Sequence, residues 1–363
     1  MKRRKFINTA GAGMAGILAA GTAPAFAQAA PEVKWRLTSS FPKSLDTIFG
    51  AAEVISKRVA SATNNKFQIQ VFASGEIVPG FQALDAAQNG TVQACHTAPY
   101  YYVGKDPTWA FGTAVPFGLN DRQFNAWWYC GGGDQVFNDF LKEYGVKALL
   151  AGNTGAQMGG WYRKEIKTVE DLKGLKLRIG GFAGQVLAKL GVVAQQIPGG
   201  EIYPALEKGT IDAAEWVGPY DDEKLGLNKV AKYYYYPGWW EGASVGSIYI
   251  NLKAWEELPK PYKAMVETAS GLVTSWMVPK YDAGNPAALR RLVANGVELR
   301  PFTREILNAC YKAAQELYAE ESARNPKFKK IHESWKKFMV EEHIWFRVVE
   351  QQFDNFMLGQ KIA

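Results

Sequence analysis

The sequence predicts an α/β protein made of two units, each with a mainly parallel sheet flanked by helices. Short β-like runs alternate with longer helical runs through most of the chain, which is typical of open parallel sheets covered by helices. The alternation occurs in two successive series, and a length of 363 residues suffices for about two domains. A cleft between two such units is a favoured place for a small ligand.

The first series begins near residue 33. Residues 33–38 and 66–73 alternate apolar and polar side chains as strands do, and they flank a predicted helix over 44–63. A further helix is expected over 81–88 and a strand over 91–97. This βαβαβ order predicts the first sheet.

The second series has shorter runs. Its expected elements are, in chain order, strands at 146–152, 157–163 and 175–179, a helix at 182–190, a strand at 192–197, a helix at 202–208 and a strand at 210–217. A strand at 243–251, helical sequence over 252–295, a strand at 297–301 and helices over 304–324 and from 326 follow. Pro259, Pro261 and Pro279 are expected to start or kink the long helical stretch. The aromatic run at 233–236 is expected to pack at the surface between the two units.

The first 27 residues have the features of an export leader. Four basic residues at 2–5 precede a weakly apolar stretch, and residues 25–27 (A-F-A) form a cleavage site. Arg3 and Arg4 are typical of a twin-arginine signal, with a general secretory leader as the alternative. A Gly- and Ala-rich composition argues against a membrane anchor. We therefore expect a soluble periplasmic protein that begins at Gln28.

The net charge belongs mostly to this leader. Removing its four positive charges lowers +7 to +3, spread over the remaining 336 residues. Such a balance is ordinary for a soluble protein and does not indicate a nucleic-acid partner. Beyond the leader the chain lacks the roughly 18 uninterrupted apolar residues that a membrane helix needs, so no membrane insertion is expected.

Cysteine and histidine are too scarce for a metal or nucleophile site of the Cys/His type. The three cysteines are Cys95, Cys130 and Cys310, and the three histidines are His96, His332 and His343. We expect the cysteines to be buried apolar thiols, although one disulfide remains possible in an oxidising compartment.

A serine hydrolase is the enzyme alternative. The run from Gly242 through Ser244 to Gly246 fits the G-x-S-x-G pattern. That pattern requires a strand before the serine and a helix after it, whereas a β-like run follows Ser244. We therefore do not expect catalysis.

Arg178 is the first candidate for ligand binding. It closes the alternating run L-K-L-R-I at 175–179 and precedes Gly180 and Gly181. An arginine at a strand end can present its fork of donors to a carboxylate. Taken alone, an arginine at a strand end is usually a structural or solvated charge.

Three motifs carry a family resemblance. Residues 168–178 (T-V-E-D-L-K-G-L-K-L-R), 203–213 (Y-P-A-L-E-K-G-T-I-D-A) and 75–80 (G-E-I-V-P-G) resemble the extracytoplasmic solute receptors of tripartite ATP-independent periplasmic (TRAP) transporters, the DctP family. The resemblance covers essentially residues 33–363. It implies a two-lobed periplasmic binding protein of type II-like architecture with a long C-terminal helix. It also implies an arginine, here Arg178, that binds the substrate carboxylate.

Within that family the chain looks most like the branch that binds 2-oxo acids such as pyruvate. Residues 214–219 (A-E-W-V-G-P) and 95–97 (C-H-T) carry this similarity. In that branch the ligand is held with a cation, sodium or alternatively calcium. By resemblance, the side chains of Gln157 and Glu215 would bind the cation, and Trp216 would give its carbonyl and close the pocket with its ring. Glu241 would be a further cation ligand.

Other residues are candidates to line the same cleft, with ordinary core or hinge packing as the alternative for each. They are His96, Thr97, Tyr100, Tyr101, Tyr102, Asn153 and Phe182. His96 and Thr97 end a predicted strand of the first sheet, where ligands of α/β proteins usually bind.

The implied function is that of a non-enzymatic receptor that captures a small 2-oxo acid and delivers it to a TRAP permease. Lactate or a C4-dicarboxylate is the alternative ligand. We expect lobe I over 33–153 with about 244–285, and lobe II over 154–243 with about 286–325. Residues 326–363 form the C-terminal helix, whose aromatic stripe is expected either to pack on its own core or to join a homodimer. The stripe consists of Trp335, Phe338, Trp345, Val349, Phe353 and Phe356.

Overall fold

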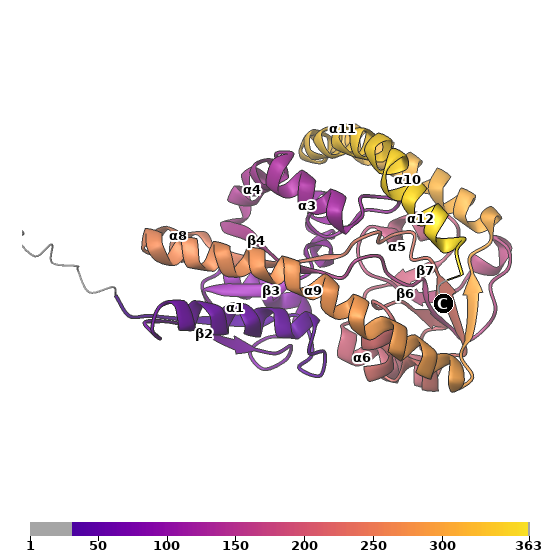
Figure 1. The fold of residues 1–363 in the computed structure, drawn as a ribbon, viewed down its shortest axis with the longest axis horizontal. Helices are drawn as coiled ribbons and strands as arrows, with labels where there is room; N and C mark the ends of the chain where they lie inside the picture. Colours follow the sequence, from indigo (N-terminus) through magenta and orange to yellow (C-terminus); the bar gives the residue numbers. More distant parts are fainter. Residues whose placement is uncertain (1–30, 362–363) are drawn as a thin grey trace, which may run out of the picture.

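The computed structural model describes residues 31–361 and contains two mixed sheets (Figure 1). The expected leader over 1–27 lies outside the described residues. The first sheet has the order β2-β1-β3-β10-β4. Its strands are β1 (Val33–Ser39), β2 (Phe67–Phe72), β3 (Ala94–Thr97), β4 (Val146–Asn153) and β10 (Val245–Asn251). The strand β1 pairs in parallel with β2 and β3, whereas β10 is antiparallel to both neighbours.

Apolar side chains on both faces of β4 explain its burial. Ala148 and Leu150 belong to one hydrophobic cluster, and Leu149 and Ala151 belong to another. The first cluster includes residues of α2 (Ala83–Gln88), α3 (Asp121–Cys130) and α4 (Gly133–Leu141). The second includes residues of α1 (Ile48–Ala62) and α9 (Lys260–Ala294). Because successive strand residues point to opposite faces, helices cover both sides of this sheet.

The second sheet has the order β11-β9-β5-β8-β6-β7. Its strands are β5 (Gly160–Tyr162), β6 (Lys176–Arg178), β7 (Val193–Gln195), β8 (Ala213–Ala214), β9 (Tyr233–Tyr236) and β11 (Glu298–Pro301). The strand β5 is antiparallel to β8 and β9, and the other pairs are parallel. The predicted α/β class with two helix-flanked sheets is therefore confirmed, but the first sheet has as many antiparallel as parallel pairings.

The prediction for the tyrosine run was wrong. Tyr233–Tyr236 form β9 inside the second sheet instead of packing between the units. Tyr234 stacks on Trp161 of β5 with ring centroids 4.0 Å apart. Aromatic side chains favour strands because they pack well across neighbouring strands, and this preference applies here.

The chain crosses three times between the sheets, after β4, after β9, and from β10 to β11 through α8 (Leu252–Glu257) and the long helix α9. The first two crossovers are joined by backbone hydrogen bonds. The N–H of Gln157 donates to the carbonyl of Glu241 at 3.1 Å, and the N–H of Thr154 donates to that of Ser244 at 3.0 Å. The long helix α9 contacts β4 and α1 of the first unit and α7 (Pro219–Lys224) of the second. Pro279 lies inside α9 and does not end it.

The remaining helices follow the predicted order. They are α5 (Ala183–Ala188), α6 (Gly199–Glu207), α8 (Leu252–Glu257), α10 (Arg304–Arg324), α11 (Pro326–Val348) and α12 (Glu350–Leu358). Among residues 31–361, no helix combines the length and apolar character needed to cross a membrane.

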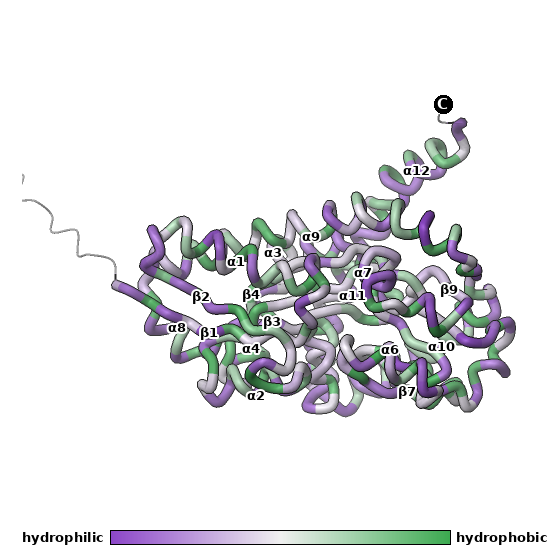
Figure 2. The backbone as a smooth tube through the Cα atoms, turned by 90° about the horizontal axis from the view of Figure 1, so that it is seen from below, coloured by the Kyte–Doolittle hydropathy of each residue, from purple (hydrophilic) through white to green (hydrophobic). Residues whose placement is uncertain are grey.

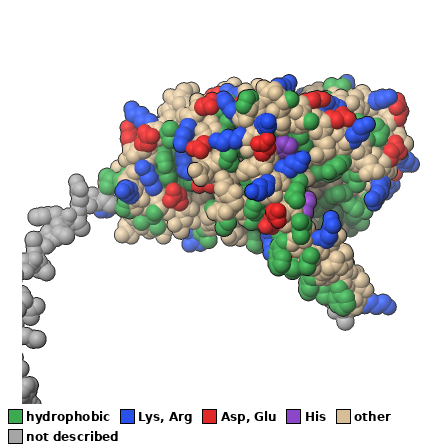
Figure 3. All heavy atoms as spheres, turned by 90° about the horizontal axis from the view of Figure 1, so that it is seen from above, with side chains coloured by type: hydrophobic (Ala, Val, Ile, Leu, Met, Phe, Trp, Pro, Cys, Tyr) green, Lys and Arg blue, Asp and Glu red, His purple; other side chains and the backbone are tan. Residues whose placement is uncertain are grey.

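The apolar side chains of the C-terminal segment are buried at the start of α11 and mostly exposed from Val340 onwards. Phe328, Ile331 and Trp335 of α11 are buried. Figure 2 shows α12 projecting from the body, and Figure 3 shows hydrophobic side chains gathered on that projection. The exposed apolar residues of this segment are Val340, Ile344, Trp345, Val348, Val349, Phe353, Phe356, Met357 and Leu358. The predicted aromatic stripe is thus buried at its start and exposed over the rest.

The cysteine prediction holds for two of the three residues. Cys95 and Cys310 are buried, whereas Cys130 is exposed, and all three are free. Cys130 is the last residue of α3, directly before Gly131, which places it at the surface.

Candidate functional site

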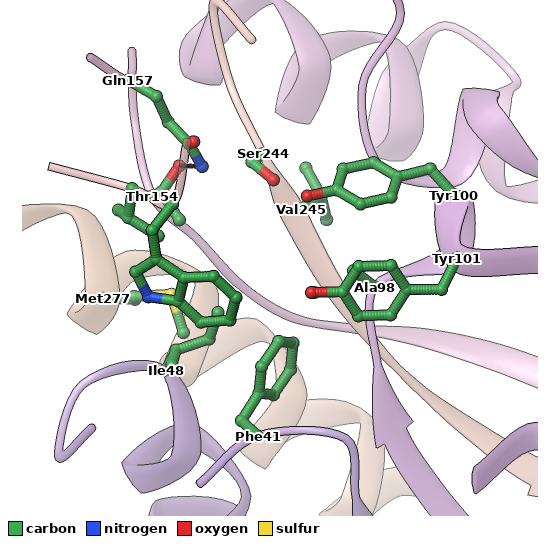
Figure 4. Close-up of a pocket in the computed structure, with 13 residues that line it drawn as sticks. Phe41, Ile48, Ala98, Tyr100, Tyr101, Thr154, Gln157, Ser244, Val245 and Met277 are labelled. Atoms are coloured by element: carbon green, nitrogen blue, oxygen red, sulfur yellow. Dashed lines mark hydrogen bonds between the residues drawn. The ribbon is translucent and has the colours of Figure 1, made fainter. Parts of the chain in front are cut away.

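A small pocket lies between the two units, where the crossovers and α9 meet (Figure 4). It is lined by Phe41, Ile48, Ala98, Tyr100, Tyr101, Thr154, Gln157, Trp216, Val217, Ser244, Val245, Gly246 and Met277. Tyr100 and Tyr101 follow β3 of the first sheet, and Trp216 follows β8 of the second. The residues that end strands in both sheets therefore face one another across the pocket, as is usual for ligand sites of α/β proteins.

Arg178, Glu215 and Glu241 form a buried charged cluster beside this pocket, and none of the three borders it directly. Arg178 ends β6, and its Nη1 forms an ion pair with Oε1 of Glu215. The same nitrogen donates to the Glu215 carbonyl at 2.7 Å, and Nε donates to the Ile197 carbonyl at 3.0 Å.

Aromatic residues connect the cluster to the pocket. The Arg178 guanidinium lies 5.1 Å from the centre of the Trp216 ring. The Tyr100 side chain lies near Glu241, and the Tyr101 side chain lies near Arg178. A ligand in the pocket would thus be separated from the buried charges by no more than one side chain.

Burial dominates the electrostatics of the cluster. It raises the pKa of Glu215, and the Arg178 charge and the Gly180 N–H, 2.9 Å from Oε1, offset this only in part. Burial and the neighbouring Glu215 charge raise the pKa of Glu241 well above its ordinary value. Two carboxylates with one arginine leave the cluster short of positive charge whenever both are ionised.

The cluster also holds oxygen atoms that lack partners. Among the described residues, Oε1 of Gln157, Oε2 of Glu215 and Oε2 of Glu241 are buried without a hydrogen bond. Unsatisfied buried acceptors are costly, and hard cations such as sodium or calcium prefer oxygen ligands of this kind. The donor set therefore fits a hard cation. Within residues 31–361 there is no group of three or more His, Cys, Asp or Glu side chains placed to hold a metal ion, so this donor set contains only two carboxylates and needs amide or carbonyl oxygens as well.

Two further predicted residues have a free polar atom. Asn153 ends β4, and its Nδ2 is buried without a partner, while Oδ1 accepts from the Gly155 N–H at 3.0 Å. Nδ1 of His96 lies 3.1 Å from Oγ of Ser39, and its Nε2 is buried without a partner. Burial lowers the pKa of His96 to about 3, so the ring is neutral.

Thr97, Tyr102 and Phe182, like Arg178, Glu215 and Glu241, are not among the residues that line the pocket, and their side chains have partners elsewhere. The Thr97 hydroxyl is occupied by Ser40 at 2.7 Å and by Tyr102 at 3.0 Å, and Tyr102 belongs to the hydrophobic cluster that includes α2, α3 and α4. The Phe182 ring stacks on Tyr318 of α10 and on Phe328 of α11, both at 5.6 Å. Ligand contact by Thr97, Tyr102 and Phe182 stays a prediction.

Sequence reasoning missed the apolar wall of the pocket. Phe41, Ile48 and Met277 line it, but their sequence contexts predict only core packing. They come from a loop, a helix start and the middle of α9. No local pattern could have found them, because only the tertiary fold brings these segments together.

Glycines permit two close approaches. A Cβ on Gly180 would lie 2.6 Å from the Tyr100 ring, and a Cβ on Gly199 would lie 2.5 Å from the Trp216 ring. A real Cβ is essentially never found at such distances. The two aromatic walls of the pocket therefore depend on glycine at these positions.

The serine-hydrolase geometry is not present. Ser244 borders the pocket, but β10 begins at the next residue. The nucleophile elbow instead requires a helix after the serine.

Comparison with known proteins places this site in a family. The profile described as bacterial extracellular solute-binding protein, family 7, matches residues 38–325. A monocarboxylate 2-oxoacid-binding periplasmic protein from Nostoc sp. is 51% identical over 360 residues, covering 98% of this chain and 99% of that protein.

Two crystal structures are close in fold and sequence. A TRAP transporter solute-binding protein from Bordetella bronchiseptica has 54% identity and a TM-score of 0.89, covering 90% of this chain and 98% of that one. It is a dimer with copurified calcium and picolinate in one active site and an apo site for comparison. A TRAP periplasmic solute-binding protein from Pseudoalteromonas atlantica, with bound sodium and pyruvate, has 37% identity and a TM-score of 0.87, covering 91% and 100%. The chain therefore belongs to the bacterial extracellular solute-binding proteins of family 7.

Proposed function

We propose that this protein is a periplasmic receptor of a TRAP transporter that binds a small 2-oxo monocarboxylate, such as pyruvate, together with sodium or calcium. The main structural support is a set of buried oxygens without hydrogen-bond partners, on Gln157, Glu215 and Glu241, together with the buried Arg178. Support also comes from the relatives, which are described as binding a 2-oxo acid or as holding pyruvate with sodium.

Different residues bind the ligand carboxylate and the cation. Arg178 pairs with the carboxylate, and the side-chain oxygens of Gln157, Glu215 and Glu241 hold the cation together with the Trp216 carbonyl. When bound, the cation accepts one carboxylate oxygen and the keto oxygen as a five-membered chelate. Further polar groups that can contact the ligand are Nδ2 of Asn153, Nε2 of His96 and the Tyr100 hydroxyl.

The apolar wall supports a monocarboxylate over a C4-dicarboxylate. Phe41, Ile48 and Met277 form part of the lining, and among residues 31–361 no lysine or arginine lines the pocket, so Arg178 beside it is left for one carboxylate. A second carboxylate would therefore be buried without a partner, which is costly. Lactate carries a 2-hydroxyl group where pyruvate carries the 2-keto oxygen. Competition in a calorimetric titration distinguishes the two ligands.

The receptor role follows from the two-lobed architecture. We assign residues 33–153 and about 244–285 to lobe I, and 154–243 and about 286–325 to lobe II. Closure of the lobes about the crossovers would enclose the ligand, and opening at the permease would release it. The leader over 1–27 would direct the protein to the periplasm, and no covalent step is required.

We also propose that residues 340–358 join a homodimer. Trp345, Phe353 and Phe356 are 55, 63 and 65% exposed, although they are among the most apolar residues of the chain. Large exposed apolar surfaces usually mark an interface. The Bordetella relative is a dimer.

Calorimetry of ligand-stripped protein tests the function. Pyruvate in sodium buffer should bind to the wild type and not measurably to Arg178→Ala. The matched control is Arg163→Ala, an exposed arginine of the same lobe. Lactate and succinate serve as competing ligands, and tighter binding of either would overturn the 2-oxo acid assignment. Ester hydrolysis that disappears in Ser244→Ala would overturn the receptor role.

A further inference from the structure

Asp46 contacts residues of both lobes. It lies in the connection from β1 to α1 of lobe I, two residues before the pocket residue Ile48. Its carboxylate forms an ion pair with Lys224 and accepts from the Tyr220 hydroxyl at 3.1 Å. Both partners belong to α7 of lobe II. Lys280 of α9 adds a contact of 2.8 Å to the same carboxylate.

The helix α7 is connected directly to the part of lobe II that forms the pocket wall. It begins directly after Trp216, Val217 and Gly218, the segment that carries the wall of the pocket. Asp222 anchors it, because its carboxylate accepts from the N–H groups of Val217 and Gly218, both at 3.1 Å. The carboxylate also accepts from the indole N–H of Trp161 in β5 at 2.9 Å.

Tyr220 and Lys224 contact each other as well as α9. The Lys224 ammonium lies 3.5 Å from the centre of the Tyr220 ring, and the Tyr220 N–H donates to Oδ1 of Asn285 at 3.0 Å, a further contact with the segment assigned to lobe I. Tyr220 and Lys224 thus form one preorganised unit. Preorganisation matters because little side-chain freedom remains to be lost when Asp46 arrives.

We propose that Asp46, Tyr220 and Lys224 form an interlobe latch that stabilises the closed cleft and slows the escape of bound solute. The contacts span 174 and 178 residues of sequence and link groups from opposite lobes. These contacts break when the lobes separate, so they stabilise the closed state and not the open one. The latch deepens the proposed function, because the solute it retains is the one proposed above.

The charges fit this role. Asp46 is partly buried, but hydrogen bonds from Lys224 and Lys280 outweigh that burial and lower its pKa to about 2. The carboxylate is therefore ionised at neutral pH. The side chains of Asp46 and Lys224 are 51 and 28% exposed, so solvent screens the pair and the latch is weak enough to open.

Dissociation kinetics test the latch. Release of pyruvate in sodium buffer is followed by tryptophan fluorescence for Asp46→Ala, Lys224→Met and Tyr220→Phe. Each change should speed release roughly 1.5- to 5-fold, as expected for loss of a partly exposed contact. The double variant Asp46→Ala/Lys224→Met should be no faster than Asp46→Ala, because both changes break one interaction. Asp85→Ala is the matched control, since Asp85 pairs with Lys105 inside lobe I at similar exposure. Unchanged release from Asp46→Ala would overturn the proposal.

A second measurement does not depend on the ligand. Spin labels at positions 57 and 208, on exposed sites of α1 and just after α6, report the distance between the lobes in a Cys130→Ser background. In ligand-free protein the population with the shorter distance should fall in Asp46→Ala. An unchanged distribution would contradict the latch. A changed distribution in a protein that fails to bind pyruvate would refute the proposed ligand and leave the latch standing.

Discussion

The guanidinium of Arg178 and the carboxylate of Glu215 form an ion pair in which each side chain is only 1% exposed. The pair is neutral as a whole, so Arg178 has no net charge to offer a second anion. Bringing an anionic ligand next to it would add an uncompensated charge to a buried site, which is strongly unfavourable. A cation that binds together with the ligand compensates the ligand's negative charge and so removes this unfavourable free energy.

Ligand affinity should therefore depend on the cation. Replacing sodium by choline, which is too large for the oxygen cluster, should weaken pyruvate binding roughly 10-fold or more. Pyruvate should strengthen sodium binding by the same factor, because coupling between two sites is reciprocal. Calorimetric titrations at constant ionic strength measure both factors. Equal affinity in sodium and choline would contradict the cation site.

Glu215→Gln distinguishes the role of Glu215 as a cation ligand from its role as the charge partner of Arg178. The substitution leaves the Arg178 charge uncompensated, so an anion can bind without a cation. We expect weaker binding in sodium and a smaller ratio between sodium and choline. Glu207→Gln, an exposed change on α6, should keep the wild-type ratio.

Adjacent glycines of α6 provide a test of the pocket wall. In Gly199→Ala the new methyl group would lie 2.5 Å from the Trp216 ring and would displace it, whereas Gly200 has nothing within 4 Å. Pyruvate affinity should fall about 10-fold or more in Gly199→Ala, as expected when a wall of a binding site is misplaced. It should stay unchanged in Gly200→Ala. Similar affinities in the two variants would show that the indole does not contact the ligand.

The stability of lobe II should depend on pH through Asp221. Burial raises the pKa of this carboxyl from 3.8 to about 7, and the hydrogen bond from Tyr281 at 2.6 Å offsets this only in part. A raised pKa means that the folded state favours the protonated acid. The stabilising contribution is therefore complete below about pH 4 and is lost as the pH rises through about 7.

Asp221→Asn removes this titration and keeps an acceptor for Tyr281. Its melting temperature should exceed that of the wild type by several degrees at pH 8, with the difference shrinking towards pH 5. Asp354→Asn, an exposed change on α12, serves as the control. A difference that does not vary with pH would show that Asp221 is ionised throughout.

Truncation tests the dimer. Because Phe328, Ile331 and Trp335 are buried in the body, the cut belongs after Met339 and not at Pro326. Light scattering after size exclusion should show a dimer for the full chain and a monomer for the truncated one. Pyruvate binding should persist, since no pocket residue is removed. Trp345→Ser with Phe353→Ser should act in the same direction, and dimers that survive both changes would place the interface elsewhere.

Much of the fold could be predicted because local patterns carry it. The helix over Arg304–Arg324 was predicted to the residue, and the strand at Val245–Asn251 within two residues. The strand expected at 210–217 shrank to Ala213–Ala214, because pairing partners, and not local preference, decide where a ladder ends. The tyrosine run showed the same limit, since its strand depends on neighbours at Gly160–Tyr162 and Glu298–Pro301.

The sequence by itself determined the α/β class, the two series of elements and the strand-end position of Arg178, since periodicity and composition are local properties. Family resemblance added Gln157, Glu215 and Trp216. Only the tertiary structure decided that Arg178 is paired with Glu215, that Phe182 stacks on Tyr318, and that Phe41, Ile48 and Met277 form part of the pocket's apolar wall. The net charge of a buried site and the shape of a pocket depend on which distant segments meet, and no local pattern records that.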